Sequence, residues 1–258
     1  MRDRNGRVRR ILGLGAAFVL AAGAAGAAES KIKTFAAGLS YDNFSRTVVW
    51  KGDAASAVIR ANTVAARADL GFRKGVVLSL SAGLSLTDFE GLAFNSLPIT
   101  LEFAGPSISG LVLGAEVLAP LLKSSDFEIS GTGRFVYSLG MSKTWPLEDF
   151  AVEGKAKGKP GWMEASVGPR VSYLFFGRVI PYLEVCARWL RADFKMTETL
   201  ADLEGTETKI VRGDISFSAA LGVDGVVTDW LTVKAKAGVL PYVGGVDTMF
   251  SVGLLYKF

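Results

Sequence analysis

Acidic side chains gather in two segments of the sequence, where paired carboxylates could act as general acid and base. They are Glu148, Asp149 and Glu153 in the first segment, and Glu198, Asp202, Glu204 and Glu207 in the second. The chain has no histidine, so it lacks the commonest general base and the usual partner of a nucleophilic serine or cysteine. Acids clustered in loops are usually just solvated. We therefore predict no catalytic residues, and no motif indicates a cofactor or a metal site.

The N-terminal segment indicates export. The basic stretch MRDRNGRVRR precedes an uncharged run from Ile11 to Ala28 that ends in small residues, and we predict that residues 1–27 are a cleaved signal peptide. A retained membrane anchor is the alternative, because this run approaches the length of a bilayer crossing. The segment carries five arginines and one aspartate, so it accounts for the whole net charge of +4. The mature chain is then about neutral, and the basic pI gives no support to nucleic-acid binding. A single cysteine, Cys186, allows no internal disulfide.

Beyond this segment, apolar residues recur at every second position. In GVVLSLSAGLSLTD, one set of alternate residues is apolar and the other is small and polar. The same pattern returns at 127–141, 163–173, 215–223 and 231–239, and it indicates strands with one apolar and one polar face. Charged residues of both signs fall on the polar faces, and we call them the charge ladder: Arg67, Asp69, Glu116, Glu128, Arg134, Glu164, Arg170, Glu184, Arg188, Asp214, Lys234 and Lys236.

The two faces must meet different surroundings. An arginine or lysine facing hydrocarbon at the bilayer centre costs about 2–4 kcal/mol, so the charge ladder must point inward if lipid lies outside. In lipid every backbone polar group needs a partner, so the sheet must close. We predict an all-β, antiparallel up-and-down transmembrane barrel of about ten strands, with eight or twelve as alternatives, forming one domain over 28–258. So narrow a barrel is largely filled by its own side chains.

The connections support this topology. The expected strands are 33–42, 58–72, 76–87, 107–119, 127–142, 162–174, 180–193, 210–223, 230–240 and 248–258. Tight turns then alternate with longer loops at 43–57, 88–106, 143–161 and 194–209, as in barrels whose termini share the periplasmic side. A secreted periplasmic barrel or sandwich, with the last strand packed inside, is the alternative.

Aromatic residues and the last strand point the same way. Two aromatic girdles are expected at the membrane surfaces, the lower from Phe72, Phe127, Tyr173, Phe175, Trp230, Tyr256 and Phe258, and the upper from Tyr41, Tyr137 and Trp189. The last strand carries apolar residues at alternate positions: Phe250, Val252, Leu254, Tyr256 and Phe258. With this strand the chain resembles the bacterial outer-membrane β-barrels, of the small porin or OmpA-like class. The resemblance implies that the strand is read by the barrel assembly machinery.

Two expected loops carry unusual side chains. The loop EGKAKGKPGW holds Lys155, Lys157 and Lys159 above the membrane level, where they could attract the phosphates of lipopolysaccharide or simply be solvated. The loop DFEGLAFNSLPITLEFAG is apolar for a segment facing water. It could fold over the barrel mouth, dock on a partner, or extend two strands beyond the membrane.

The sequence leaves three functions open. The first is a monomeric outer-membrane barrel with a structural or surface role and a largely plugged, charged lumen. The second is a narrow channel for ions or small solutes. The third is a surface adhesin that binds through the long loops. Outer-membrane phospholipases, lipid A deacylases and omptin proteases rely on a histidine as families, so their activities are not expected here.

Overall fold

The structure is a computed structural model that describes residues 32–50, 56–95, 97, 101–103, 105–147, 153–174, 176–212, 215–242 and 245–258. The predicted signal peptide, Asp214, Glu148 and Asp149 lie outside these residues. Within the described part, no helix is long and apolar enough to cross a membrane.

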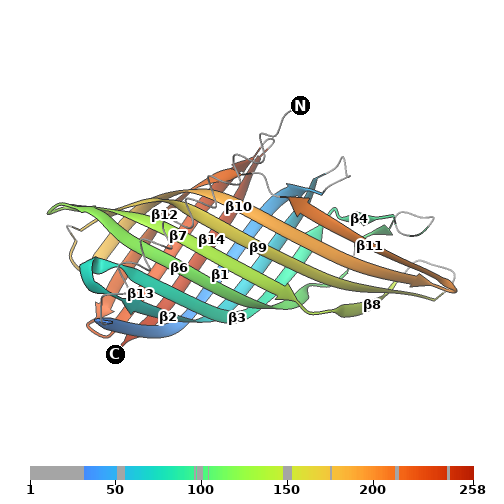
Figure 1. Ribbon diagram of the computed structural model, residues 1–258, viewed down its shortest axis with the longest axis horizontal. Coiled ribbons are helices and arrows are strands. Elements are labelled where there is room, and N and C mark those ends of the chain that lie inside the picture. The colour runs from blue at the N-terminus through green and yellow to red at the C-terminus, as the bar shows by residue number, and fades with distance from the viewer. Residues whose placement is uncertain are drawn as a thin grey trace.

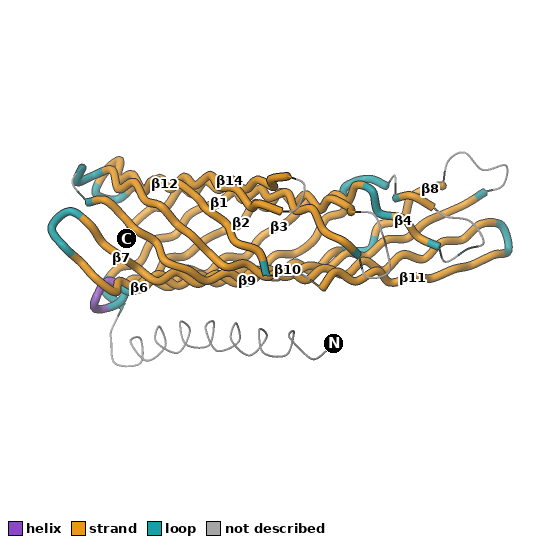
Figure 2. Tube along the Cα trace, turned by 90° about the horizontal axis from the view of Figure 1, so that it is seen from above, coloured by secondary structure: helices purple, strands orange, loops and turns teal. Residues whose placement is uncertain are grey.

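Ten long strands close into a ring (Figure 1). They are β1 (Thr34–Val49), β2 (Ser56–Gly71), β3 (Val77–Glu90), β6 (Ile108–Lys123), β7 (Phe127–Gly140), β9 (Gly154–Tyr173), β10 (Val179–Leu200), β12 (Ser216–Thr228), β13 (Leu231–Tyr242) and β14 (Gly245–Lys257). Each pairs antiparallel with the next, and β14 pairs with β1 from Met249 to Lys257 to close the ring. The predicted ten-stranded up-and-down barrel is confirmed. Figure 2 shows these strands winding obliquely around the long axis of the tube.

Two further strands lengthen one side of the barrel. β8 (Lys143–Leu147) follows β7 and pairs with the first residues of β9. β11 (Leu203–Arg212) pairs with the second half of β10, from Arg191 to Leu200, and β12 pairs with the first half. The prediction of long loops at 43–57, 143–161 and 194–209 is therefore wrong, because most of these residues extend the strands. β10 and β11 are joined by the two-residue turn Ala201–Asp202, where Ala201 has a positive φ of 50°.

We call the end of the barrel with the short turns, where the C-terminus lies, its lower end, and the end with β4, β8 and β11 its upper end. The lower part of the barrel carries an apolar belt on its outside. Exposed apolar side chains from every ring strand form it, among them Leu39, Val64, Leu80, Leu113, Phe135, Leu183, Phe217, Val239 and Leu254. At the end with the short turns, aromatic rings meet in a girdle: Phe35 with Phe258, Phe127 with Tyr173, and Trp230 with Tyr256. Phe217 is 66% exposed, which contradicts the alternative of a barrel or sandwich that buries its apolar stripes in its own centre.

The upper part of the barrel reverses this arrangement. Along β10, Leu183 and Val185 face outward and Glu184 faces inward. Beyond Trp189 the inward residues up to Met196 are apolar, and Arg191 and Lys195 are exposed. The apolar interior of this part, which we call the upper core, includes Trp50, Ile59, Phe89, Leu92, Phe94, Phe103, Ile108, Leu190, Phe194 and Met196. The upper part is thus built like a water-soluble protein, and the lower part like a membrane protein.

The apolar loop between β3 and β6 completes the upper core. Its short strands β4 (Ala93–Phe94) and β5 (Leu101–Glu102) pair only with each other. They form a separate small sheet, so the ring still has ten strands. Leu92, Phe94 and Phe103 are buried, and the rings of Phe94 and Phe103 lie 5.4 and 5.2 Å from that of Phe194. Figure 1 shows β4, β8 and β11 together at the end opposite the C-terminus. Of the three predicted alternatives, the described residues of this loop fit the one in which it folds over the barrel mouth.

Candidate functional site: the charged interior of the barrel

Below the upper core, Arg67 is the centre of one ion-pair network. Its Nε lies 2.7 Å from Asp69 Oδ1, and its Nη1 lies 3.3 Å from Glu116 Oε2 on β6. Its Nη2 donates a hydrogen bond of 2.8 Å to Ser79 Oγ on β3. Lys234 Nζ reaches the other oxygen of Asp69 at 2.7 Å from β13, on the far side of β14 and β1. This network therefore crosses the lumen as well as linking neighbouring strands.

A second group of ion pairs lies nearer the upper core. Arg188 Nη1 on β10 contacts Glu164 Oε1 on β9 at 2.6 Å, and Arg188 Nε donates to Ser218 Oγ at 2.8 Å. Arg134 Nη2 on β7 lies 3.0 Å from Asp42 Oδ1 on β1. Lys236 Nζ on β13 lies 3.2 Å from Glu184 Oε1 on β10. Arg134 thus reaches across β2, β3 and β6, whereas Lys236 reaches across β12 alone.

Arg170 and Tyr182 contact each other at the end of the lumen with the short turns. Arg170 Nη2 contacts Asp224 Oδ2 at 2.6 Å, and its guanidinium carbon lies 3.5 Å from the centre of the Tyr182 ring. This is a cation–π arrangement, which is strongest away from water. Gly222 lies under the Tyr182 ring, where a Cβ would lie 2.2 Å from the ring carbon Cζ, so glycine is needed there.

The structure brings most of the charge ladder together in these contacts. Glu128 makes no ion pair with a described residue, but it accepts a hydrogen bond from Ser130 Oγ at 3.1 Å. Asp214 lies outside the described residues. Asp42, Asp224 and the buried Arg46 also belong to the interior, although the sequence analysis did not include them. Asp42 and Asp224 stand in phase with the polar faces of β1 and β12, but they fall at the predicted strand ends, where facing was not assigned.

Two small cavities lie among these side chains. A cavity of about 40 Å³ is lined by both Arg134–Asp42 and Arg188–Glu164, and a second of about 20 Å³ lies beside Arg67 and Glu116. One ordered water needs roughly 10–15 Å³ on this measure, so the cavities hold a few waters rather than a continuous column. Paired charges and small cavities make the interior a salt-bridged polar core.

Two of the clustered acids, Glu198 and Glu207, lie within strands. Glu198 is fully buried on the inner face of β10, and Glu207 Oε2 accepts a hydrogen bond from the backbone N–H of Asn95 while its Oε1 lies 3.1 Å from Lys209 Nζ. The interpretation of these two acids as solvated loop residues is wrong, because they belong to strands. Among the described residues, no cluster of histidine, cysteine and carboxylate side chains is arranged to hold a metal ion.

The exterior of the upper part carries a positive patch. Lys155, Lys157 and Lys159 are exposed on β9, and Lys159 pairs directly with Lys195 in the β9–β10 register. Like charges placed opposite each other destabilise a sheet. Asp193 lies near this patch, and partial burial raises the pKa of its carboxyl while Arg191 and Lys159 lower it to a smaller extent. The four lysines, which we call the lysine patch, make no ion pair with any described residue.

The last strand, β14, contributes to the apolar belt. Phe250, Leu254 and Tyr256 are exposed on the outside of β14, while Met249 and Leu255 are buried between them. Tyr256 packs against Trp230 and Phe258 in the aromatic girdle. The alternate apolar residues therefore form one outward stripe.

Comparisons with known proteins support the fold. No family model matches the sequence, and no curated protein matches it. The solved structures that resemble it include two with TM-scores above 0.5. The outer membrane protease OmpT from Escherichia coli has a TM-score of 0.52 at 10% identity, covering 89% of this chain and 98% of its own. The translocator domain of the autotransporter NalP from Neisseria meningitidis has a TM-score of 0.51 at 12% identity, covering 93% of both chains. The chain therefore has the fold of the bacterial outer-membrane β-barrels.

Proposed function

We propose that this protein is an integral outer-membrane barrel with a structural and surface role, whose interior is closed to solutes. The observation that carries the proposal is the change of interior along the tube, from paired charges in the belt region to the apolar upper core. An ion that entered the charged part would meet the buried rings of Phe89, Phe94 and Phe194 before reaching the outside. The chain's lack of histidine further supports a role without catalysis.

Bilayer conductance of the purified barrel tests the closed interior. We expect no steady single-channel current, because neither cavity provides a water-filled path. The matched comparison is a variant in which Leu92, Phe94 and Phe103 are replaced by serine, which weakens the apolar closure. Discrete, reproducible current steps from the unmodified protein would instead favour the narrow ion or small-solute channel.

The lysine patch favours lipopolysaccharide as a surface partner. Lys155, Lys157, Lys159 and Lys195 lie above the apolar belt, where the phosphates of that lipid are expected, and bound phosphate would offset the Lys159–Lys195 repulsion. The variant Lys157→Glu/Lys159→Glu should co-purify with severalfold less lipopolysaccharide. Lys123→Glu, at the opposite end of the barrel, is the control. Equal amounts bound to all three proteins would reject this contact.

A surface adhesin would use the upper part differently from the sequence expectation. The binding surface would be the faces of β8, β9, β10 and β11 rather than loops, because the residues between 143 and 209 are mostly strand.

We propose further that residues 1–27 direct export. The outward stripe of β14 is proposed to be read by the barrel assembly machinery. Replacing Phe250 and Tyr256 by serine should then reduce the amount of assembled barrel, whereas Thr248→Ser should not.

A further inference from the structure

Two buried arginines converge on the inner face of β12. Arg46 Nη2, from β1, donates to Ser216 Oγ at 2.8 Å, and Arg188 Nε, from β10, donates to Ser218 Oγ at 2.8 Å. Ser216 is also the register partner of Arg188 in the β10–β12 pair. Because β13 and β14 separate β12 from β1, Arg46 spans the lumen to reach this point. Two positive groups are thereby held close together inside the barrel.

Among the described residues, Arg46 has no direct counter-ion. It is 7% exposed, and none of its atoms lies within 4.0 Å of a carboxylate oxygen of a described residue. Asp247, an acid on the neighbouring strand β14, instead accepts hydrogen bonds from the N–H and the hydroxyl of Thr47 at 2.7 and 2.9 Å. Glu164 is already occupied by Arg188. A buried charge without a partner is strongly unfavourable, so this arrangement calls for an anion.

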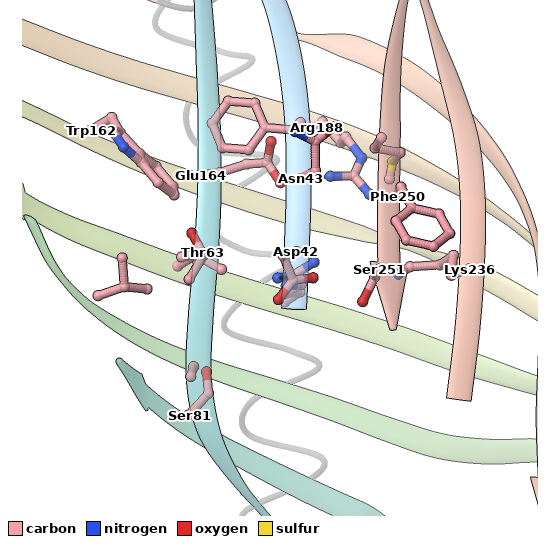
Figure 3. A pocket seen from close by; sticks show the side chains of 16 residues that line it. Asp42, Asn43, Thr63, Ser81, Trp162, Glu164, Arg188, Lys236, Phe250 and Ser251 are labelled. Carbon is pink, nitrogen blue, oxygen red and sulfur yellow. Dashed lines mark hydrogen bonds and ion pairs between the residues drawn. The ribbon is translucent and has the colours of Figure 1, made fainter. Parts of the chain in front are cut away.

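Both arginines keep unused hydrogen-bond donors. Arg46 Nη1 and Arg188 Nη2 are both buried and bond to no described residue. Arg188 is 3% exposed and lines the cavity of about 40 Å³. Figure 3 shows its guanidinium beside Glu164, with Asp42, Ser251 and Lys236 around the same space. Each cation that lines this cavity has a carboxylate partner: Arg134 pairs with Asp42, Arg188 with Glu164, and Lys236 with Glu184. The one positive charge in excess nearby is therefore that of Arg46, which does not itself line the cavity.

From these observations we propose that the cavity binds a monovalent inorganic anion of the size of chloride, held by Arg188 Nη2 and balancing the charge of Arg46. The volume suits this occupant, because the space of about 40 Å³ holds two or three water-sized particles but no larger organic acid. The single excess charge matches a monovalent ion. Both carboxylates at the cavity are already in ion pairs, so they leave the remaining donors available.

Bromide provides a direct test, since it replaces chloride and is located by its anomalous scattering. In crystals of the whole barrel grown with bromide, we expect an anomalous peak within hydrogen-bond reach of Arg188 Nη2. The same crystals of the variant Arg46→Met should show a much weaker peak, because the excess charge is gone. Density for water alone, with no anomalous signal at this point, would overturn the proposal.

A solution measurement separates loss of the ion from loss of the fold. The unfolding temperature of the detergent-solubilised barrel should rise with chloride relative to gluconate at equal ionic strength. In Arg46→Met the chloride concentration that gives the same rise should increase about tenfold or more, because the uncompensated charge that attracts the anion is removed. Arg60→Met, on the exposed Arg60–Glu90 pair, should leave the chloride response unchanged. An equal response in Arg46→Met and the unmodified protein would contradict the assignment.

Discussion

Arg188 Nη1 and Glu164 Oε1 lie 2.6 Å apart on adjacent strands, and their side chains are 3% and 8% exposed. This pair stands at the top of the charged interior, directly below the apolar upper core that begins with Leu190 and Trp162. It therefore marks the height at which the barrel changes from a polar to an apolar filling. Partners within hydrogen-bond distance compensate for the cost of burying both charges.

Removing one member of this pair should be far more damaging than removing an exposed charge. Glu164→Gln leaves Arg188 buried without its counter-ion, and we expect a loss of about 3–5 kcal/mol in the free energy of unfolding. The control is Glu90→Gln, which breaks the Arg60–Glu90 contact of 2.8 Å between side chains that are 55% and 65% exposed. That loss should be at most about 1 kcal/mol. Denaturant unfolding of the barrel in micelles measures both, and similar losses would show that the Arg188–Glu164 pair is not buried in solution.

The upper core should unfold separately from the belt region. Phe94→Ala removes a fully buried ring that packs against Phe194, and cavities of this kind cost about 3–5 kcal/mol. Because such contacts hold Leu92, Phe94 and Phe103 in the upper core, proteases should cut near these residues faster in the variant. The ring of strands should remain closed, so migration on unboiled gels should not change. Loss of the folded gel form together with faster cleavage would mean that the two parts are one cooperative unit.

Asp193 should make stability depend on pH on the outside of the upper part. Partial burial raises the pKa of this carboxyl above its ordinary value of 3.8, so the folded protein binds the proton more tightly than the unfolded chain. Stability from this group is then fully present below the ordinary pKa and is lost as the pH rises through the raised one. Asp193→Asn should thus be more stable than the unmodified protein at neutral pH, and the difference should shrink on acidification toward pH 3.8. A difference that is constant with pH would exclude this cause.

The belt region could be predicted from the sequence because alternation and charge cost act together there. In β3, an apolar stripe without arginine alternates with serine and glycine. Only the apolar stripe can face lipid at low free-energy cost. The partners within the charge ladder could not be predicted, since they depend on how the tilted strands are staggered. Lys234 and Asp69, for example, come from strands that are not neighbours.

The strands of the upper part could not be predicted in the same way, because there the alternating pattern has polar residues outside and apolar or small residues inside. In β9, Lys155, Lys157 and Lys159 alternate with Gly154, Ala156 and Gly158, and small residues beside lysines were interpreted as a loop. The small residues are there because large rings fill the interior: a Cβ at Gly158 would lie 2.7 and 2.8 Å from the rings of Trp145 and Phe194. The alternation alone could have identified the strand, but not the solvent outside it.

The change of surroundings along β10 is the central claim, and spin-label accessibility measures it most directly. Single cysteines are introduced at Leu183, Val185, Phe194, Lys195 and Thr199 in a Cys186→Ala background, and the barrel is reconstituted into vesicles. We predict that labels at Leu183 and Val185 are accessible to oxygen in the bilayer, that labels at Lys195 and Thr199 are accessible to a water-soluble relaxant, and that the label at Phe194 is protected from both. If the labels at Lys195 and Thr199 behave like those at Leu183 and Val185, the two-part account of this barrel is contradicted.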